Sequence, residues 1–154
     1  METTKNSIER VGLKVGLLTL LALIAYFFLM KALGLAHIFE LRFFNFIILA
    51  LGICYGIQKL KEALNEKDFY LKGLSEGMFI SFVAVTLFGV FIGFYLEYFD
   101  VKLLEDIKLN STMGNYMNGL TIFIVITSEG IASGVIITLI AMQYYKVSGE
   151  KKVE

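Results

Sequence analysis

The stretch GLSEGMFISFVAVTLFGVFIGFYLEYF, residues 73–99, decides the fold of this chain. Its only charged residues, Glu76 and Glu97, both lie near its ends. An α-helix needs about 20 predominantly apolar residues to cross the roughly 30 Å hydrocarbon core of a bilayer. The stretch has no alternation with a period of two and is much longer than a typical β-strand. It therefore predicts a transmembrane helix.

Three further apolar runs of similar length occupy residues 12–35, 41–60 and 119–145. The short link between the first two predicts a helical hairpin. The chain has 154 residues and is 57% apolar, whereas soluble domains are about 45–50% apolar. Too few polar residues remain to cover four such helices in water. We therefore expect one all-α domain over residues 1–154, an integral membrane, antiparallel four-helix bundle.

The first run also has an alternative interpretation as a signal peptide. Lys5 and Arg10 precede it, and residues 34–36 resemble a small-residue cleavage site. Its apolar stretch exceeds the roughly 7–15 residues typical of such segments. We therefore expect it to be a membrane span.

The distribution of lysine and arginine predicts the orientation. With four spans, the two ends and the central link share one side and carry ten of these residues, whereas the two other links carry four. Basic residues are enriched on the cytoplasmic side of membranes. We expect both termini in the cytoplasm. In the last outer link, Val101, Leu104 and Ile107 recur at helical spacing and predict a short helix at the membrane interface.

Composition and motifs narrow the function classes. The net charge is zero, which offers no basic surface for nucleic acid. The only cysteine, Cys54, lies in an apolar run and is expected to be a packing residue. The chain contains no nucleotide loop, no metal-ligand spacing and no paired acid–base constellation. We expect no enzyme activity, no cofactor and no metal; the expected partners are the lipid bilayer and either a second copy or another membrane protein.

Glycine pairs four residues apart occur in every predicted span, and ten of the fourteen glycines belong to them. Small residues at this spacing let two helix backbones approach closely in a membrane. We expect packing seams here, within one chain or between chains; glycine is also simply common in membrane helices. The pairs in the two halves of the chain resemble each other, which duplication or shared packing demands would explain. The glycines concerned are Gly12, Gly16, Gly52, Gly56, Gly73, Gly77, Gly89, Gly93, Gly130 and Gly134.

Glu129 is the leading candidate for function because it lies well inside the last apolar run. An acid there costs about 2.5–3.5 kcal/mol, and such residues usually face the bundle interior and mark ion or proton paths. The alternatives are a protonated acid that fixes helix register by hydrogen bonding across the bundle, and a contact with a ligand or partner. Glu76 follows Lys72 by four residues, so we expect an interfacial helical ion pair there.

The third run and its exit, Gly73 to Asp100, together with Glu129–Gly134, resemble a bacterial membrane family known as domain of unknown function family 4199. The resemblance covers nearly the whole chain and implies a four-span layout in the membrane. Members often have a proline after the aspartate, where this chain has Val101. The family has no established activity, so the resemblance implies a location, a bacterial inner membrane, and assigns no functional residue. We expect a small structural or accessory membrane protein that associates through its glycine seams; a proton or cation transporter or channel using Glu129 is the alternative.

Overall fold

The computed structural model describes the backbone of residues 2–34, 43–63, 69–110 and 114–150. These residues form five α-helices and one short 3-10 turn, and none of them lies in a β-strand, so the predicted all-α fold is confirmed. The elements are α1 (Glu2–Ala32), α2 (Phe43–Ala63), α3 (Phe69–Tyr98), α4 (Val101–Asn110), η3 (Gly114–Tyr116) and α5 (Gly119–Glu150).

Four of these helices are long and apolar enough to cross a membrane. Their apolar parts are Arg10–Ala32, Phe43–Glu62, Phe69–Tyr98 and Gly119–Tyr145. The predicted runs agree with them in number and order. Helix α3 begins four residues before the predicted run, because Phe69, Tyr70 and Leu71 extend the apolar stretch at its start. The predicted span ends at residues 35 and 41 lie outside the described residues.

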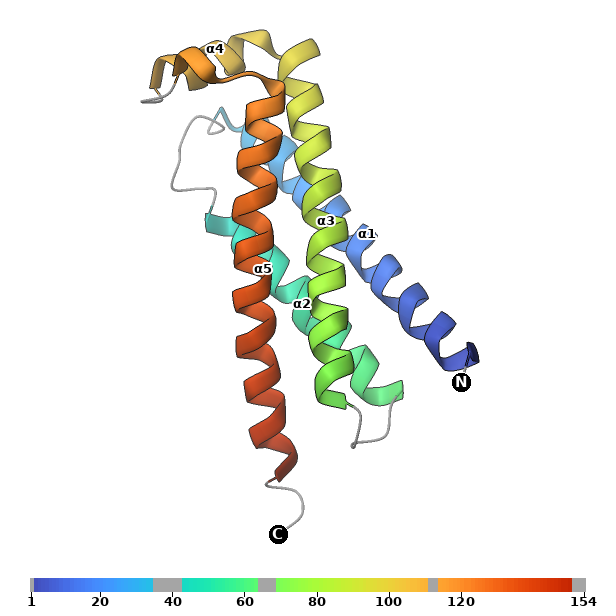
Figure 1. Cartoon of the computed structure of the whole chain (residues 1–154). Coiled ribbons are helices and arrows are strands. Elements are labelled where there is room, and N and C mark those ends of the chain that lie inside the picture. Colours follow the sequence, from blue (N-terminus) through green and yellow to red (C-terminus); the bar gives the residue numbers. More distant parts are fainter. Residues whose placement is uncertain (1, 35–42, 64–68, 111–113, 151–154) are drawn as a thin grey trace.

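Helix α3 is the centre of the bundle. It contacts α1, α2, α4 and α5, whereas α1 and α5 hardly touch each other. Half of its most apolar window is buried inside the protein, against 17–28% for the other three spans. Figure 1 shows α3 beside α5 along most of their length, with α1 and α2 crossing at an angle. The start of α1 and the end of α5 lie at the same end of the bundle (Figure 1).

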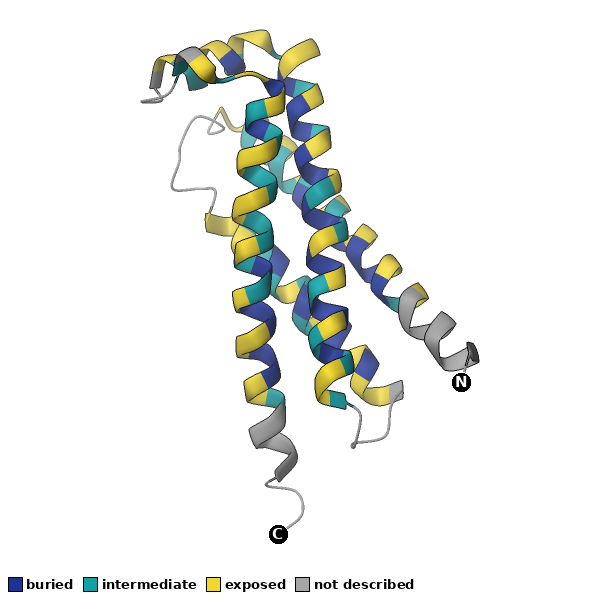
Figure 2. Cartoon of the chain, in the orientation of Figure 1, coloured by how far each residue is buried: buried dark blue, intermediate teal, exposed yellow. Residues whose placement is uncertain are grey.

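The buried residues form two clusters stacked along α3. The first lies toward the end where the chain starts and finishes, and it includes the fully buried Ile53, Ile57 and Ile80. The second lies toward α4 and includes Phe88 and Leu96 of α3. Figure 2 shows the buried positions facing inward and the exposed ones on the outside of each helix. In a bilayer the exposed apolar side chains face lipid, so close packing rather than burial holds the helices together.

Helix α4 lies across the end of the bundle above α3 and α5 (Figure 1). Leu104 is buried against the second cluster, and Ile107 packs partly against it. Val101, which belongs to the same predicted apolar set, is exposed. The predicted short helix is confirmed, and its position at a membrane interface stays a prediction.

Candidate functional site

Glu129 lies on the outside of the bundle. Its side chain is exposed on α5, with Ser128 and Ala132 also exposed beside it. The expected inward orientation is therefore wrong for the single chain. The reason is helical geometry: Gly130 and Gly134 face α3, and successive residues turn by about 100°. The residue before Gly130 must therefore point away from α3.

Glu76 is the acid that the fold buries. It is 3% exposed, seven residues after the start of α3. The side chain is buried because the face of α3 that carries Glu76 packs against α1, and its expected position at a membrane interface stays a prediction. A Cβ atom added at Gly12 of α1 would lie 2.7 Å from Glu76 Oε1. A side chain at position 12 would therefore require the Glu76 carboxyl group to shift.

The surroundings of Glu76 are poor in polar partners. Its Oε1 atom makes no hydrogen bond. The neighbouring buried cluster, which includes Val15 and Ile80, is apolar, and the Phe79 ring also reaches Gly12. A buried acid without a partner is costly as a carboxylate and far less costly as a neutral acid. Among the described residues, Glu76 is the one Asp, Glu, Lys or Arg whose side chain is buried.

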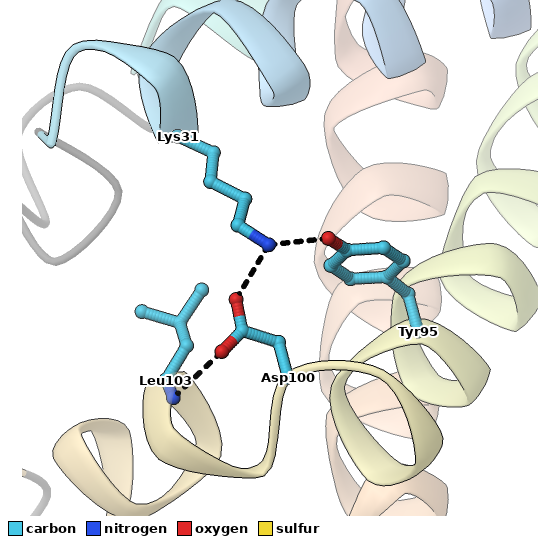
Figure 3. A network of polar contacts seen from close by, with 4 residues as sticks. All are labelled: Lys31, Tyr95, Asp100 and Leu103. Carbon is cyan, nitrogen blue, oxygen red and sulfur yellow. Dashed lines mark hydrogen bonds and ion pairs between the residues drawn. The ribbon is translucent and has the colours of Figure 1, made fainter.

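A second polar site joins three helices at the other end of the bundle (Figure 3). Lys31 Nζ, near the end of α1, lies 2.8 Å from Asp100 Oδ2. The same ammonium group donates a hydrogen bond to the Tyr95 hydroxyl of α3. Asp100 Oδ1 accepts a hydrogen bond of 3.3 Å from the backbone N–H of Leu103. Asp100 is thus the N-cap of α4 and the partner of Lys31 at once.

The charges of this second site stabilise each other. The hydrogen bond from Lys31 holds the pKa of the Asp100 carboxyl below its usual 3.8; burial acts in the opposite direction, and the Leu103 N–H adds to the lowering. The side chains of Lys31 and Asp100 are 35% and 18% exposed. A carboxylate that is paired, capping and ionised at neutral pH fastens α1, α3 and α4 together. We interpret this site as structural.

The glycine pairs all face helices of the same chain. The Cβ position of each glycine points at a residue of a neighbouring helix. The pair Gly12 and Gly16 faces α3; Gly52 and Gly56 face α1 and α3; Gly73, Gly77, Gly89 and Gly93 face α5; Gly130 and Gly134 face α3. The two halves of the chain differ in these contacts. The first glycine pair of α3 faces α5, the next long helix in the chain, whereas the pair of α1 faces α3 and not α2, the helix that follows it.

Hydroxyl side chains fill several of the notches that these glycines leave. Thr19 lies against Gly52, Thr138 against Gly77, and Ser81 against Gly134. Thr19 and Thr138 are buried, and each donates its hydroxyl hydrogen to the backbone carbonyl four residues earlier, at 2.9 and 2.7 Å. A hydroxyl that bonds its own helix needs no partner across the interface. These residues were missed from the sequence, where their only signal is their placement within apolar spans.

The remaining residues considered in the sequence analysis are the single cysteine, the single histidine and possible metal ligands. Cys54 is free and packs partly against the first cluster, as expected of a packing residue. His37 lies outside the described residues. No group of three His, Cys, Asp or Glu side chains among the described residues lies close enough to hold a metal ion.

Comparison of the chain with protein-family models, with curated proteins and with solved structures finds no match.

Proposed function

We propose that this chain is a structural or accessory protein, not an enzyme, that binds another membrane protein chain through the outer face of α5. The observation that supports this is the exposed Glu129 in the apolar part of α5. Ionisable residues within membrane spans almost always face protein or a water-filled cavity. Glu129 has an interaction within its own chain, and its exposed side chain faces outward beside it. A second chain on this face would cover that side chain with protein.

The glycine pairs are poor candidates for the contact with a partner. Each pair faces a helix of its own chain, so using it for a partner would require the bundle to open. We therefore assign the contact to the α5 face, in place of the glycine seams that the sequence suggested.

The location we propose is a bacterial inner membrane with both termini in the cytoplasm. The excess of lysine and arginine on one side supports this orientation. The resemblance to domain of unknown function family 4199 supports the same location.

Site-specific photo-crosslinking in native membranes tests the proposal. A photoreactive residue would replace Ile136 of α5, and matched controls would replace Leu21 of α1 and Leu51 of α2. All three side chains are exposed and lie in the apolar spans. We expect protein adducts from position 136 and only lipid adducts from positions 21 and 51. Protein adducts of equal yield at all three positions, or at none, would contradict the proposal.

A proton or cation path is a second candidate, and the buried Glu76 is the observation that favours it. Its unpartnered Oε1 lies inside the bundle, whereas Glu129, the residue first suggested for this role, faces outward. Proton flux in liposomes tests this candidate. We expect Glu76→Gln to abolish any flux that the wild type shows and Glu129→Gln to leave it unchanged. A wild type no leakier than protein-free liposomes would rule the candidate out.

A further inference from the structure

We propose that one end of the bundle binds the headgroups of anionic phospholipids. We call it the basic end; it is formed by the start of α1, the end of α2 and the start of α3. The basic side chains described there are Arg10, Lys14, Lys59, Lys61 and Lys72. Three features support the inference: the balance of charge at the two ends, the pairing of the cations and their depth in the membrane. It is independent of the proposed function, because it concerns lipid and a different part of the surface.

The basic residues of three helices lie around the same end of the bundle. Figure 1 shows the start of α1, the end of α2 and the start of α3 at the end that also holds the last turns of α5. The contacts agree with this view, since the Cβ position of Gly56 in α2 lies near both Val15 of α1 and Ile80 of α3. The cations of these helices thus share one end of the molecule.

The two ends of the bundle carry opposite balances of charge. Among the described residues, the basic end has five basic side chains and two acidic ones, the exposed Glu62 and the buried Glu76. The opposite end, which includes α4, has three basic and four acidic side chains: Lys31, Lys102, Lys108, Glu97, Asp100, Glu105 and Asp106. Anionic headgroups are therefore attracted to the basic end and not to the opposite end.

Most cations of the basic end have no acid of the described chain as a partner. Four of them are exposed and form no ion pair with a described acid: Arg10, Lys14, Lys59 and Lys61. Lys72 has an interaction within the chain. At the opposite end, Lys31 Nζ lies 2.8 Å from Asp100 Oδ2. Within the described residues the four exposed charges lack a counter-charge, which a lipid phosphate would supply.

Aromatic rings hold two of these lysines at the surface of the bundle. Lys59 Nζ lies 5.2 Å from the centroid of the Tyr55 ring. Lys61 Nζ lies 5.9 Å from the ring centroid of Phe69 in α3 and 5.5 Å from that of Tyr145 in α5. The face of a ring attracts a cation without removing its charge. Both ammonium groups are thus positioned by the protein and still able to bind a phosphate.

The depth of the basic end favours a lipid headgroup over other anions. On this side the apolar spans begin at Arg10 and Phe69 and end at Glu62 and Tyr145. The cations therefore lie where the hydrocarbon core meets the headgroups, and long basic side chains near the end of a span extend toward that interface. Each basic residue near an anionic membrane surface strengthens binding by about fivefold. A headgroup phosphate is the anion that always lies within reach of these side chains.

Quenching of tryptophan by brominated lipids tests the lipid preference at each end. The chain has no tryptophan, so one introduced residue reports on the lipids around it. Tyr144→Trp lies at the basic end beside Tyr145, and Tyr98→Trp lies at the opposite end. The two replaced tyrosines are 70% and 68% exposed, so the reporters are matched. Liposomes contain brominated phosphatidylglycerol with unbrominated phosphatidylcholine, and the reverse mixture is the reference.

The two reporters should give different answers. We expect phosphatidylglycerol to be preferred over phosphatidylcholine several-fold at position 144 and not at position 98. Equal preference at the two positions, or none at position 144, would overturn the inference. Because the liposomes contain only this chain, the result does not depend on a protein partner of α5, and the photo-crosslinking result does not depend on the lipid preference.

Charge substitutions identify the residues responsible. In the Tyr144→Trp background, Lys59→Gln combined with Lys61→Gln removes two cations and should bring the two lipids to within about twofold of equal binding. Lys59→Arg combined with Lys61→Arg keeps both charges and should keep the preference. Lys102→Gln combined with Lys108→Gln, at the opposite end, should leave it unchanged. A glutamine variant with the full preference, or an arginine variant without it, would overturn the role of the two charges.

Discussion

Asp100 performs two tasks with one side chain, and two substitutions separate them. Alanine at position 100 removes both the N-cap of α4 and the ion pair with Lys31. Loss of a cap costs about 0.5–2 kcal/mol, and loss of a partly exposed ion pair about 0.2–1 kcal/mol. We expect Asp100→Ala to destabilise the protein by about 1–3 kcal/mol in a detergent unfolding assay. Asp100→Asn keeps the cap and should lose less than half of that. Equal losses in the two variants would show that α4 does not depend on its cap.

The same residue predicts an acid-dependent loss of stability. Lys31 lowers the pKa of Asp100 below 3.8 in the folded protein. A group whose pKa is depressed by folding stabilises the protein above its unfolded pKa, and this contribution is lost as the pH falls through the folded value. We expect the stability difference between wild type and Asp100→Asn to be constant from pH 7 to about 5, and to shrink below about pH 4. A difference that vanishes already at pH 6 would contradict the assignment.

At the scale of the helices, the glycine contacts differ in how tightly they fit. A Cβ atom at Gly134 of α5 would lie 2.5 Å from Ser81 Cβ, an atom fixed to the α3 backbone. A Cβ atom at Gly16 of α1 would meet Val83 at 3.2 Å, which a small adjustment accommodates. We expect Gly134→Ala to cost about 1–3 kcal/mol by overpacking and Gly16→Ala to be nearly neutral.

Thermal unfolding of these two variants at several protein-to-lipid ratios checks the prediction. Because the contact lies within one chain, the loss in Gly134→Ala should not depend on dilution. A loss that disappears on dilution would show that the glycine acts between chains instead.

The helices themselves followed from the sequence, whereas the direction of their polar side chains did not. Apolar length alone predicts the four spans, since hydrocarbon leaves few alternatives to a helix. Which face of a span is inside depends on its neighbours. Glu129 was expected inside by its depth, although its position next to Gly130 already excludes it from the face shared with Gly134. Glu76 gave no comparable signal, because its burial depends on a glycine in another helix, Gly12.

The site that ties α1 to α4 was equally hidden from the sequence. Lys31 and Asp100 lie 69 positions apart, and no local sequence pattern predicts that their side chains meet. The helix-capping role of Asp100 was readable in principle, since an aspartate before an amphipathic run is a common helix start. Val101 then takes the first helical position, which also accepts proline. A proline at that position would fit the same backbone.

At the scale of the whole molecule, α3 is the helix against which α1, α2, α4 and α5 all pack. Helix α5 lies against it along three glycine pairs, and α1 is held at two points, where Glu76 meets Gly12 and where Lys31 meets Tyr95 and Asp100. Each outer helix is thus positioned by α3 and exposes its other face. The face of α5 differs from those of α1 and α2 because it carries an acid near mid-span. This asymmetry is why we assign partner binding to α5.

The same arrangement makes the orientation in the membrane testable at two exposed positions. Lys61, in the last turn of α2, and Lys102 of α4 lie beyond opposite ends of α3. If the basic side is cytoplasmic, a cysteine at position 102 should react with a membrane-impermeant maleimide in intact spheroplasts. A cysteine at position 61 should react only after permeabilisation, and one at position 51, exposed within the α2 span, should react poorly in both cases. All three variants carry Cys54→Ser. Labelling of positions 61 and 102 from the same side would contradict the four-span topology, and labelling of position 61 alone would invert the orientation.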